Sequence, residues 1–360
     1  MSGVWGKKIN ISIFGESHGE AIGIVMDGLP SGLKLDLNYI DYEMKRRAPG
    51  KNSISTARKE QDRFDILSGY FEERTTGTPL CAIIKNSDKK SKDYSKIKEV
   101  MRPGHADFTG NIKYEGYNDY RGGGHFSGRI TAPLVFAGAV AKQILEKKGV
   151  VIGSHIKSIK YIQDTNFNLI DIKEEQLKEL RLEEFPTIDK DKKEEMKEII
   201  LQAKERGDSV GGIVECAAIN LDSGLGSPFF DSIESTLSHL LFSIPAIKGV
   251  EFGAGFDITE MLGSESNDEF YYEDNKVKTY SNNNGGILGG ITNGMPLVFR
   301  CAIKPTPSIS KTQRTIDINK KENVILNVTG RHDPCIVQRA VPVIEAVTAI
   351  ALLDVYLNKN

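Results

Sequence analysis

Two histidines stand in glycine-containing turns where an imidazole is well placed to exchange protons. His18 lies in the stretch GESHG, directly after an apolar run, and His105 lies in RPGHAD, close to an arginine and an aspartate. Imidazole titrates near neutral pH, so both side chains suit general acid–base catalysis. For His18 taken alone, a structural role in its turn is the simpler interpretation.

Arginines and glycine clusters accompany these histidines and indicate an anionic ligand. The stretch YRGGGHFSGR places Arg121 and Arg129 around three consecutive glycines, just ahead of a segment that predicts a helix. Glycines there let backbone N–H groups approach an anion, and guanidinium groups add charge-assisted hydrogen bonds. Further glycine pairs occur at 211–212, 285–286 and 289–290. Any one cluster is equally well explained as a tight turn, but several together favour a shared anion site.

A fourth stretch, GRHDPC, precedes the apolar C-terminal segment. Asp333 followed by Pro334 suits an N-cap and the first residue of a helix. Capping is therefore one role for this carboxylate, and a chemical role stays open beside it.

Composition and missing motifs exclude several classes of protein. The chain has 360 residues, 39% of them hydrophobic, which is enough for a substantial core. A formal charge of -2 disfavours a nucleic-acid binder. No P-loop, GxGxxG, HExxH, CxxC or GxSxG motif is present, so phosphoryl-transfer, dinucleotide, metal and nucleophile-elbow sites lack their signatures. Scattered cysteines, and no apolar run of about 18 residues, predict a cytoplasmic protein without a membrane segment.

Short apolar runs bounded by Gly and Pro predict strands, and longer periodic runs predict helices. The expected strands are 9–14, 22–26, 79–84, 211–218, 295–302 and 324–328. The expected helices are 130–148, 231–243 and 334–357, the last apolar nearly all the way round and therefore buried. The charged stretch 171–206, divided by Pro186, predicts two solvent-facing helices. Without a regular βαβ cadence, the pattern alone leaves α/β and α+β both open.

Together these stretches resemble the chorismate synthase family. Three signatures occur in order, GESHGEAIGIVMDGLP, GGGHFSGRITAPLVFAGA and RHDPCIVQRAVPVIEAV, with RRAPG, TTGTP, RPGHAD, SIPAIKG, NNGGILGG and KPTPS between them. The resemblance implies an α+β fold, a β–α–β sandwich in which antiparallel sheets enclose long helices. It implies a single domain over residues 1–360, with 171–206 as a peripheral helical insert outside the resemblance.

The resemblance also implies a function. Members of the family are carbon–oxygen lyases that eliminate phosphate from 5-enolpyruvylshikimate-3-phosphate (EPSP) in an anti-1,4 sense. The product, chorismate, is formed in the last common step of aromatic amino acid biosynthesis. The family requires reduced FMN although the reaction has no net redox change. A cytoplasmic homotetramer that binds this small molecule, with no nucleic-acid or membrane partner, is expected.

By the same resemblance, His18 and His105 form the acid–base pair and Asp333 lies near the flavin, and which histidine acts on flavin or substrate stays open. Contacts to FMN carry over to His125, Phe126, Ser127, Pro245, Ala246, Gly289, Lys304, Pro305, Thr306, Pro307, Ser308 and Arg331. Contacts to the substrate or to NADPH carry over to Arg47, Arg121, Arg129 and Arg339.

The chain departs from the family pattern in three places, the first of which is a pair of residues. His125 and Phe126 replace an Arg-Ser pair, so we expect FMN affinity to weaken as His125 loses its proton. Ile130 stands where glutamate is frequent, so no carboxylate role is expected there. Ser53 replaces an arginine linked to NADPH contact, and we therefore expect an external flavin reductase to supply reduced FMN.

Two other classes explain part of the pattern. A flavin-dependent oxidoreductase would share the FMN site but would consume NAD(P)H stoichiometrically. A non-catalytic phosphate- or RNA-binding protein would account for the glycine and arginine clusters, but it leaves His18, His105 and Asp333 without a purpose.

Overall fold

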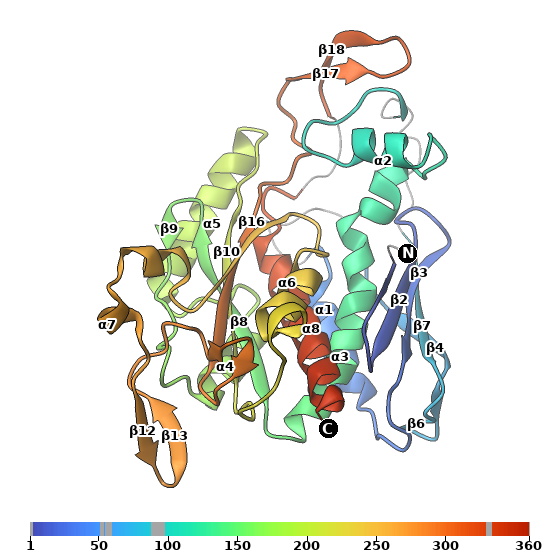
Figure 1. The fold of residues 1–360 in the computed structure, drawn as a ribbon. Coiled ribbons are helices and arrows are strands. Elements are labelled where there is room, and N and C mark those ends of the chain that lie inside the picture. Colours follow the sequence, from blue (N-terminus) through green and yellow to red (C-terminus); the bar gives the residue numbers. More distant parts are fainter. Residues whose placement is uncertain (1–2, 51–53, 55–59, 88–97, 329–332, 360) are drawn as a thin grey trace.

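The computed structural model describes residues 3–50, 54, 60–87, 98–328 and 333–359, and Figure 1 shows two antiparallel sheets with long helices between them. The first sheet has the order β1-β2-β3-β7-β4 and consists of Val4–Trp5, Asn10–Gly15, Ala21–Asp27, Leu80–Lys85 and Phe64–Ser68. The second has the order β11-β16-β10-β8-β9 and consists of Ile247–Phe252, Leu297–Ile303, Gly212–Ile219, Val151–Ile159 and Ile162–Gln163. The predicted β–α–β sandwich of α+β class is confirmed.

Four helices fill the space between the sheets (Figure 1). They are α1 (Leu37–Arg47), α3 (Thr131–Glu146), α6 (Ile233–Leu241) and α8 (Val337–Asn358). A β-carbon on Gly138 of α3 would overlap Ala346 of α8, so only glycine permits this close approach of the two helices. By length and apolarity α8 is the one described helix that could cross a membrane, but 83% of its most apolar window is buried inside the fold. It is therefore a core helix.

Buried charges join the central helices. Lys142 of α3 lies 2.7 Å from Glu345 of α8 and 2.8 Å from Glu43 of α1, and Arg46 pairs with both glutamates at 2.5 and 2.9 Å. All four side chains are almost fully buried. Because an unpaired charge in such a place is strongly unfavourable, the cluster ties the three helices into one arrangement.

The predicted elements appear close to their expected bounds, with one correction. Each expected strand is present, the last as β18 (Glu322–Leu326) paired with β17 (Gln313–Asp317). The C-terminal helix, however, starts at Val337, and its N-cap residue Ile336 makes no side-chain capping bond. The prediction that Asp333 caps this helix is wrong, because its carboxylate instead accepts a hydrogen bond of 2.6 Å from Arg339.

The charged stretch 171–206 forms two helices, as predicted. These are α4 (Glu174–Leu182) and α5 (Lys190–Glu205), and they lie beside the second sheet. Their inner faces are apolar: Leu177 is buried against Gly153 of β8, and Met196 and Ile200 of α5 are fully buried. The helices are thus solvent-facing on one side only, as their amphipathic sequences require.

Candidate active site

The triglycine turn brings the two predicted acid–base histidines together. Gly122, Gly123 and Gly124 lie in η2 (Arg121–Phe126) and have φ values of 60°, 87° and 52°, which favour glycine. A β-carbon on Gly122 would overlap the His18 ring, and one on Gly123 would lie 3.0 Å from Cε1 of His105. Both imidazoles therefore face this one turn, although they come from distant segments.

His18 follows β2 and is oriented by the residue before it. Its Nδ1 lies 3.0 Å from the Ser17 hydroxyl, which is also 3.2 Å from the carbonyl oxygens of Arg121 and Gly122. A hydroxyl that donates its proton to a carbonyl can only accept from the imidazole, so this contact places a proton on Nδ1. Both side chains are buried.

His105 precedes α2 (Asp107–Lys113) and lies beside an ion pair. Its Nδ1 is 2.7 Å from Asp107, and Arg102 binds the same carboxylate through two nitrogens at 2.7 and 2.8 Å. Burial raises the pKa of Asp107, but hydrogen bonds from Arg102 and His105 outweigh it and hold that pKa well below its usual value. Asp107 is therefore a carboxylate at neutral pH.

The predicted FMN segment 304–308 contacts the loop that carries Arg102, Gly104 and His105. Lys304 donates to the Gly104 carbonyl at 2.5 Å, and Arg102 donates to the Ser308 hydroxyl at 3.3 Å. The Lys304 backbone N–H bonds the carbonyl of Ala246 at 3.0 Å, which joins the 245–246 segment to this region. Ala246 has a φ of 79°, a strained value for a residue with a β-carbon, and such strain often marks a binding site.

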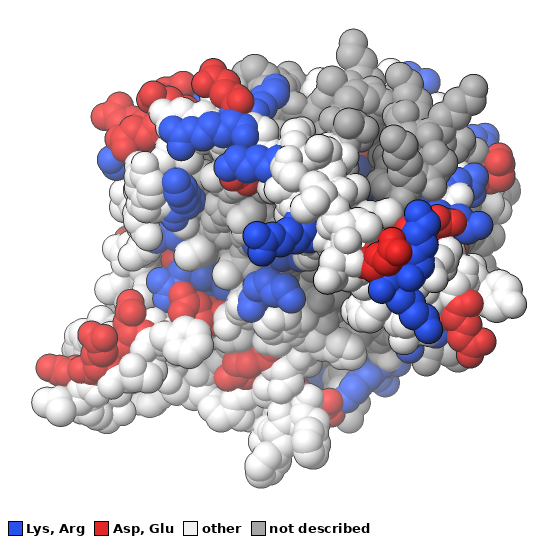
Figure 2. Space-filling model, turned by 90° about the horizontal axis from the view of Figure 1, so that it is seen from above, with Lys and Arg blue, Asp and Glu red and all other residues white. Residues whose placement is uncertain are grey.

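The region around Lys304 carries several cations. Burial and the nearby charge of Lys248 lower the pKa of Lys304, which indicates two ammonium groups close to each other. Figure 2 looks onto this region, and several Lys and Arg side chains gather in the middle of the face. Two neighbouring cations favour an anion between or beside them.

The three residues after the triglycine turn are anchored by their surroundings. His125 Nδ1 donates to the Gly15 carbonyl of β2 at 2.9 Å. The Phe126 ring packs on α2, where a β-carbon on Gly110 would lie 2.7 Å from it. The Ser127 hydroxyl accepts from the Arg129 N–H at 3.3 Å and so caps η3 (Gly128–Ile130).

Arg47 and Arg129 are buried and paired with acids that sequence reasoning missed. Arg129 contacts Asp62 and lies 2.7 Å from Glu60, while Arg47 lies 2.9 Å from Asp62. Burial lowers the pKa of Arg47 to about 10, and the nearby cations Arg339 and Arg129 add to the fall although Asp62 opposes it. The stretch around Glu60 and Asp62 carries no motif, so only the fold reveals these partners.

Asp333 and Arg339 extend this cluster. Arg339 binds Asp333 at 2.6 Å, and its Nε donates to the Arg47 carbonyl at 3.2 Å. The structure thus links Arg47 to Arg129 through the Asp62 carboxylate and to Arg339 through a backbone oxygen. Their roles toward substrate or NADPH stay predictions.

The remaining predicted residues lie in other places. Arg121 is half-exposed and paired with Asp119 at 2.8 Å. Gly289 is in the turn between β14 (Ile287–Leu288) and β15 (Ile291–Thr292), and the next residue, Gly290, contacts Ser232 at the start of α6. Arg331 and Ser53 lie outside the described residues.

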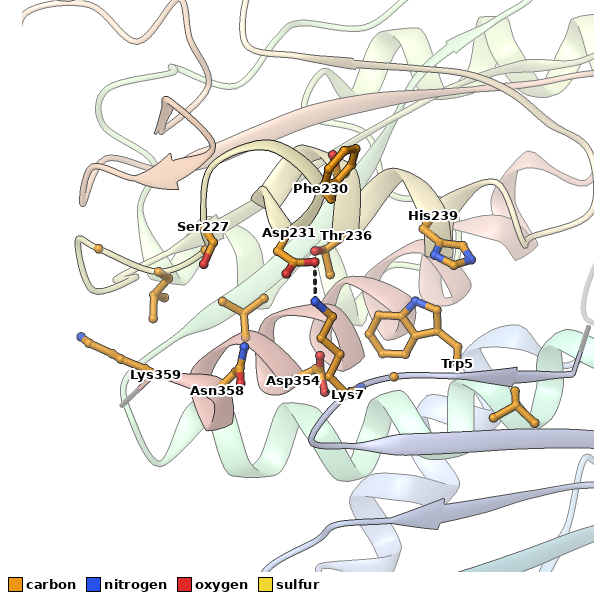
Figure 3. Close-up of a pocket in the computed structure, with 17 residues that line it drawn as sticks. Trp5, Lys7, Ser227, Phe230, Asp231, Thr236, His239, Asp354, Asn358 and Lys359 are labelled. Carbon is orange, nitrogen blue, oxygen red and sulfur yellow. Dashed lines mark hydrogen bonds and ion pairs between the residues drawn. The ribbon is translucent and has the colours of Figure 1, made fainter. Parts of the chain in front are cut away.

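A cavity of about 370 Å³ lies elsewhere, between β1, α6 and the end of α8. Figure 3 shows Trp5 beside His239 and an ion pair between Lys7 and Asp231. Of the predicted site residues that the structure describes, none lines this cavity. The triglycine turn and its two histidines are therefore separate from this cavity.

Comparisons with known proteins agree with one another. Residues 9–357 match the sequence profile of a family described as chorismate synthase. A chorismate synthase of Dehalococcoides mccartyi is 46% identical over 358 residues, covering 99% of this chain and 97% of the relative. One of Pyrococcus abyssi is 48% identical over 350 residues, covering 97% of this chain and 96% of the relative. A crystal structure of chorismate synthase matches with a TM-score of 0.78 at 32% identity, covering 99% of this chain and 93% of that chain.

Proposed function

Because this chain belongs to the chorismate synthase family, the carbon–oxygen lyases of the chorismate-forming step in aromatic biosynthesis, we propose that it eliminates phosphate from EPSP with reduced FMN. The observation that carries the proposal is the meeting of His18 and His105 on adjacent glycines, next to Lys304. Elimination of phosphate with loss of a C6 proton needs proton-transfer groups beside cations, and both are present at this turn.

The described residues fit a bound flavin nucleotide. The triglycine turn lets both imidazoles approach its backbone closely, and Lys304 with Lys248 offers positive charge for a phosphate. The hydroxyl of Thr306 is buried without a hydrogen-bond partner among the described residues, as expected for a group that awaits a ligand. We assign the FMN contacts to His125, Phe126, Ser127, Pro245, Ala246, Gly289, Arg331 and residues 304–308.

The chain's own residues would divide the chemistry between them. His18 and His105 would hold and move protons at their imidazole nitrogens, and Asp333, oriented by Arg339, would act beside the flavin. Arginine and lysine side chains would offset the negative charges of EPSP. Reduced FMN, when bound, would supply the acceptor for the C6 proton without net oxidation or reduction.

We extend the proposal to assembly and location. We propose a cytoplasmic homotetramer of single-domain subunits. Association between subunits is supported by the excursion 255–280, which projects from the sandwich in Figure 1. Large apolar side chains there are exposed, Phe256 by 79% and Tyr272 by 81%, as in surfaces that meet another subunit. The insert 171–206 would be peripheral, and a separate reductase would supply reduced FMN.

One experiment tests the function. The purified protein is incubated anaerobically with EPSP, with and without reduced FMN, while phosphate release and NADPH oxidation are followed together. Rapid phosphate release that needs only catalytic reduced FMN is expected. Stoichiometric NADPH consumption would identify an oxidoreductase instead, and binding of EPSP without phosphate release under any condition would identify a binding protein.

A further inference from the structure

We propose that Asp107 is a positioning residue that holds His105 through Nδ1 and thereby directs its Nε2 toward the triglycine turn. The inference rests on the proposed function, because it assigns a partner to one of the two imidazoles of that site. It gives a specific role to Asp107, the aspartate of the RPGHAD stretch.

The hydrogen-bond chemistry of His105 selects one tautomer. A carboxylate can only accept, so the 2.7 Å contact between Asp107 Oδ1 and His105 Nδ1 requires a proton on that nitrogen. A guanidinium nitrogen of Arg102 also lies within hydrogen-bond distance of Nδ1, at 3.1 Å, and because guanidinium only donates, a bond there needs the opposite tautomer. We take the shorter contact, to the carboxylate, as the one that orders the ring, with the proton on Nδ1 and the lone pair on Nε2.

The opposite edge of the ring faces the turn. A β-carbon on Gly123 would lie 3.1 Å from Nε2 and 3.0 Å from Cε1 of His105. The neighbouring Gly122 stands against the ring of His18. Since Asp107 holds one edge of the His105 imidazole, the other edge is directed at the place where both histidines meet.

Asp107 itself has little freedom to move. Arg102 donates to the Asp107 carboxylate through Nε, Nη2 and its backbone N–H, the last at 3.1 Å. Nη1 of Arg102 donates in turn to the Ser308 hydroxyl. The side chains of Asp107 and Arg102 are 7% and 5% exposed. A carboxylate fixed on this many donors keeps a constant direction, which is the requirement for orienting an imidazole.

The two histidines consequently differ in their supporting partners. Nδ1 of His18 meets the neutral hydroxyl of Ser17, whereas Nδ1 of His105 meets a carboxylate. A carboxylate stabilises an imidazolium more than a hydroxyl does. Two further charged groups near His105 in the described part of the chain are Arg102 on its own loop and Lys304, which binds the Gly104 carbonyl from the facing segment.

The first test is kinetic and uses Asp107→Asn, which keeps size and shape but removes the charge. We expect kcat with EPSP to fall about 10-fold or more, with much smaller changes in KM and in FMN affinity. Glu251→Gln, which removes a half-buried carboxylate 2.8 Å from Arg300, is the control and should leave kcat, KM and FMN affinity unchanged.

The second test needs no substrate or cofactor. Ring-¹⁵N-labelled histidine reports by NMR which nitrogen of each imidazole carries the proton, and His105→Gln identifies the His105 signals. We expect the Nδ1–H form in the wild-type protein, and in Asp107→Ala a marked shift toward the Nε2–H form.

Two results would overturn the inference. One is an Nε2–H form of His105 in the wild-type protein, and the other is an Asp107→Asn variant with unchanged kcat. If the wild-type protein releases no phosphate from EPSP, the proposed function fails, while the NMR measurement still decides on the positioning of His105.

Discussion

Gly123 makes room for the imidazole of His105 and also adopts a backbone conformation that other residues reach only with strain. Its φ is 87°, and any β-carbon there would press on the ring at 3.0 to 3.1 Å. Gly32 has a similar φ of 78° but no atom within 4 Å of an added β-carbon. Substitution of each glycine by alanine therefore distinguishes two effects: both variants have backbone strain, but only the one at Gly123 takes space from an imidazole.

We therefore expect Gly123→Ala and Gly32→Ala to lower the free energy of unfolding by a similar amount, roughly 1 to 3 kcal/mol. Only Gly123→Ala should lower turnover of EPSP, because only there does the new methyl group displace a histidine. Chemical denaturation and phosphate-release assays measure the two effects. Equal turnover in both variants would show that the space at Gly123 has no part in the reaction.

A second prediction concerns the proton-transfer residues. His105→Ala and Asp333→Ala should lower turnover far more than they weaken FMN binding, by roughly 100-fold or more for a lost acid–base group. Fluorescence titration of FMN and the phosphate-release assay compare the two losses. Losses of equal size in both would mean that these side chains are scaffolding.

At the scale of the elements, α1, α3 and α8 are joined by charge as well as by apolar contact. Glu345 and Lys142 are buried to within 2% and make three ion pairs with one another and with Glu43 and Arg46, and a fourth ion pair joins Arg46 to Glu43. Glu345 also accepts a hydrogen bond of 2.9 Å from Ser154 of β8, so the cluster reaches the second sheet. Removal of Glu345 would leave two buried cations, Lys142 and Arg46, with Glu43 as their one carboxylate in this cluster.

Glu345→Gln should thus lower the free energy of unfolding by about 3 to 5 kcal/mol. The matched control is Glu194→Gln on α5, where the carboxylate is 73% exposed and pairs only with Lys197. That change should stay within about 0.5 kcal/mol of the wild-type protein. Urea denaturation of both variants is the measurement, and a small effect at Glu345 would contradict the role given to the cluster.

At the scale of the whole molecule, one buried histidine makes stability depend on pH. His155 of β8 lies 2.8 Å from Asp164 and 3.0 Å from Glu215 of β10. Burial alone would lower the pKa of His155, but the two carboxylates outweigh it and raise the pKa above its usual 6.5. Asp164 also accepts from the backbone of Ile188 and Asp189, which ties the segment between α4 and α5 to the second sheet.

A group whose pKa is raised in the folded state stabilises the protein. This stabilisation is complete at a pH below the pKa of the group in the unfolded state, and it is lost as the pH rises through the pKa in the folded state. The stability difference between the wild-type protein and His155→Gln should therefore be largest below pH 6.5 and shrink in alkaline solution. Free energies of unfolding measured across this range test it. His239→Gln, at an exposed position, is the control and should show no such dependence. A difference for His155→Gln that grows with pH would contradict the sign.

Local pattern was sufficient to predict most of the elements. Runs of apolar residues between Gly and Pro gave the positions of β2, β3, β7, β10 and β16, because a strand or helix has a periodicity that nearby residues reveal. The apolar C-terminal segment predicted a buried helix for the same reason. The ordered motifs indicated the family without any coordinates.

Tertiary structure alone decided which distant side chains meet. No spacing along the chain indicates that Gly122 and Gly123 face His18 and His105, or that Asp62 pairs with Arg47 and Arg129. The same holds for Asp333, which local pattern assigned to a helix cap and the fold pairs with Arg339. Periodicity describes one element at a time, whereas an ion pair or a shared turn depends on where the sheets and helices carry separate segments.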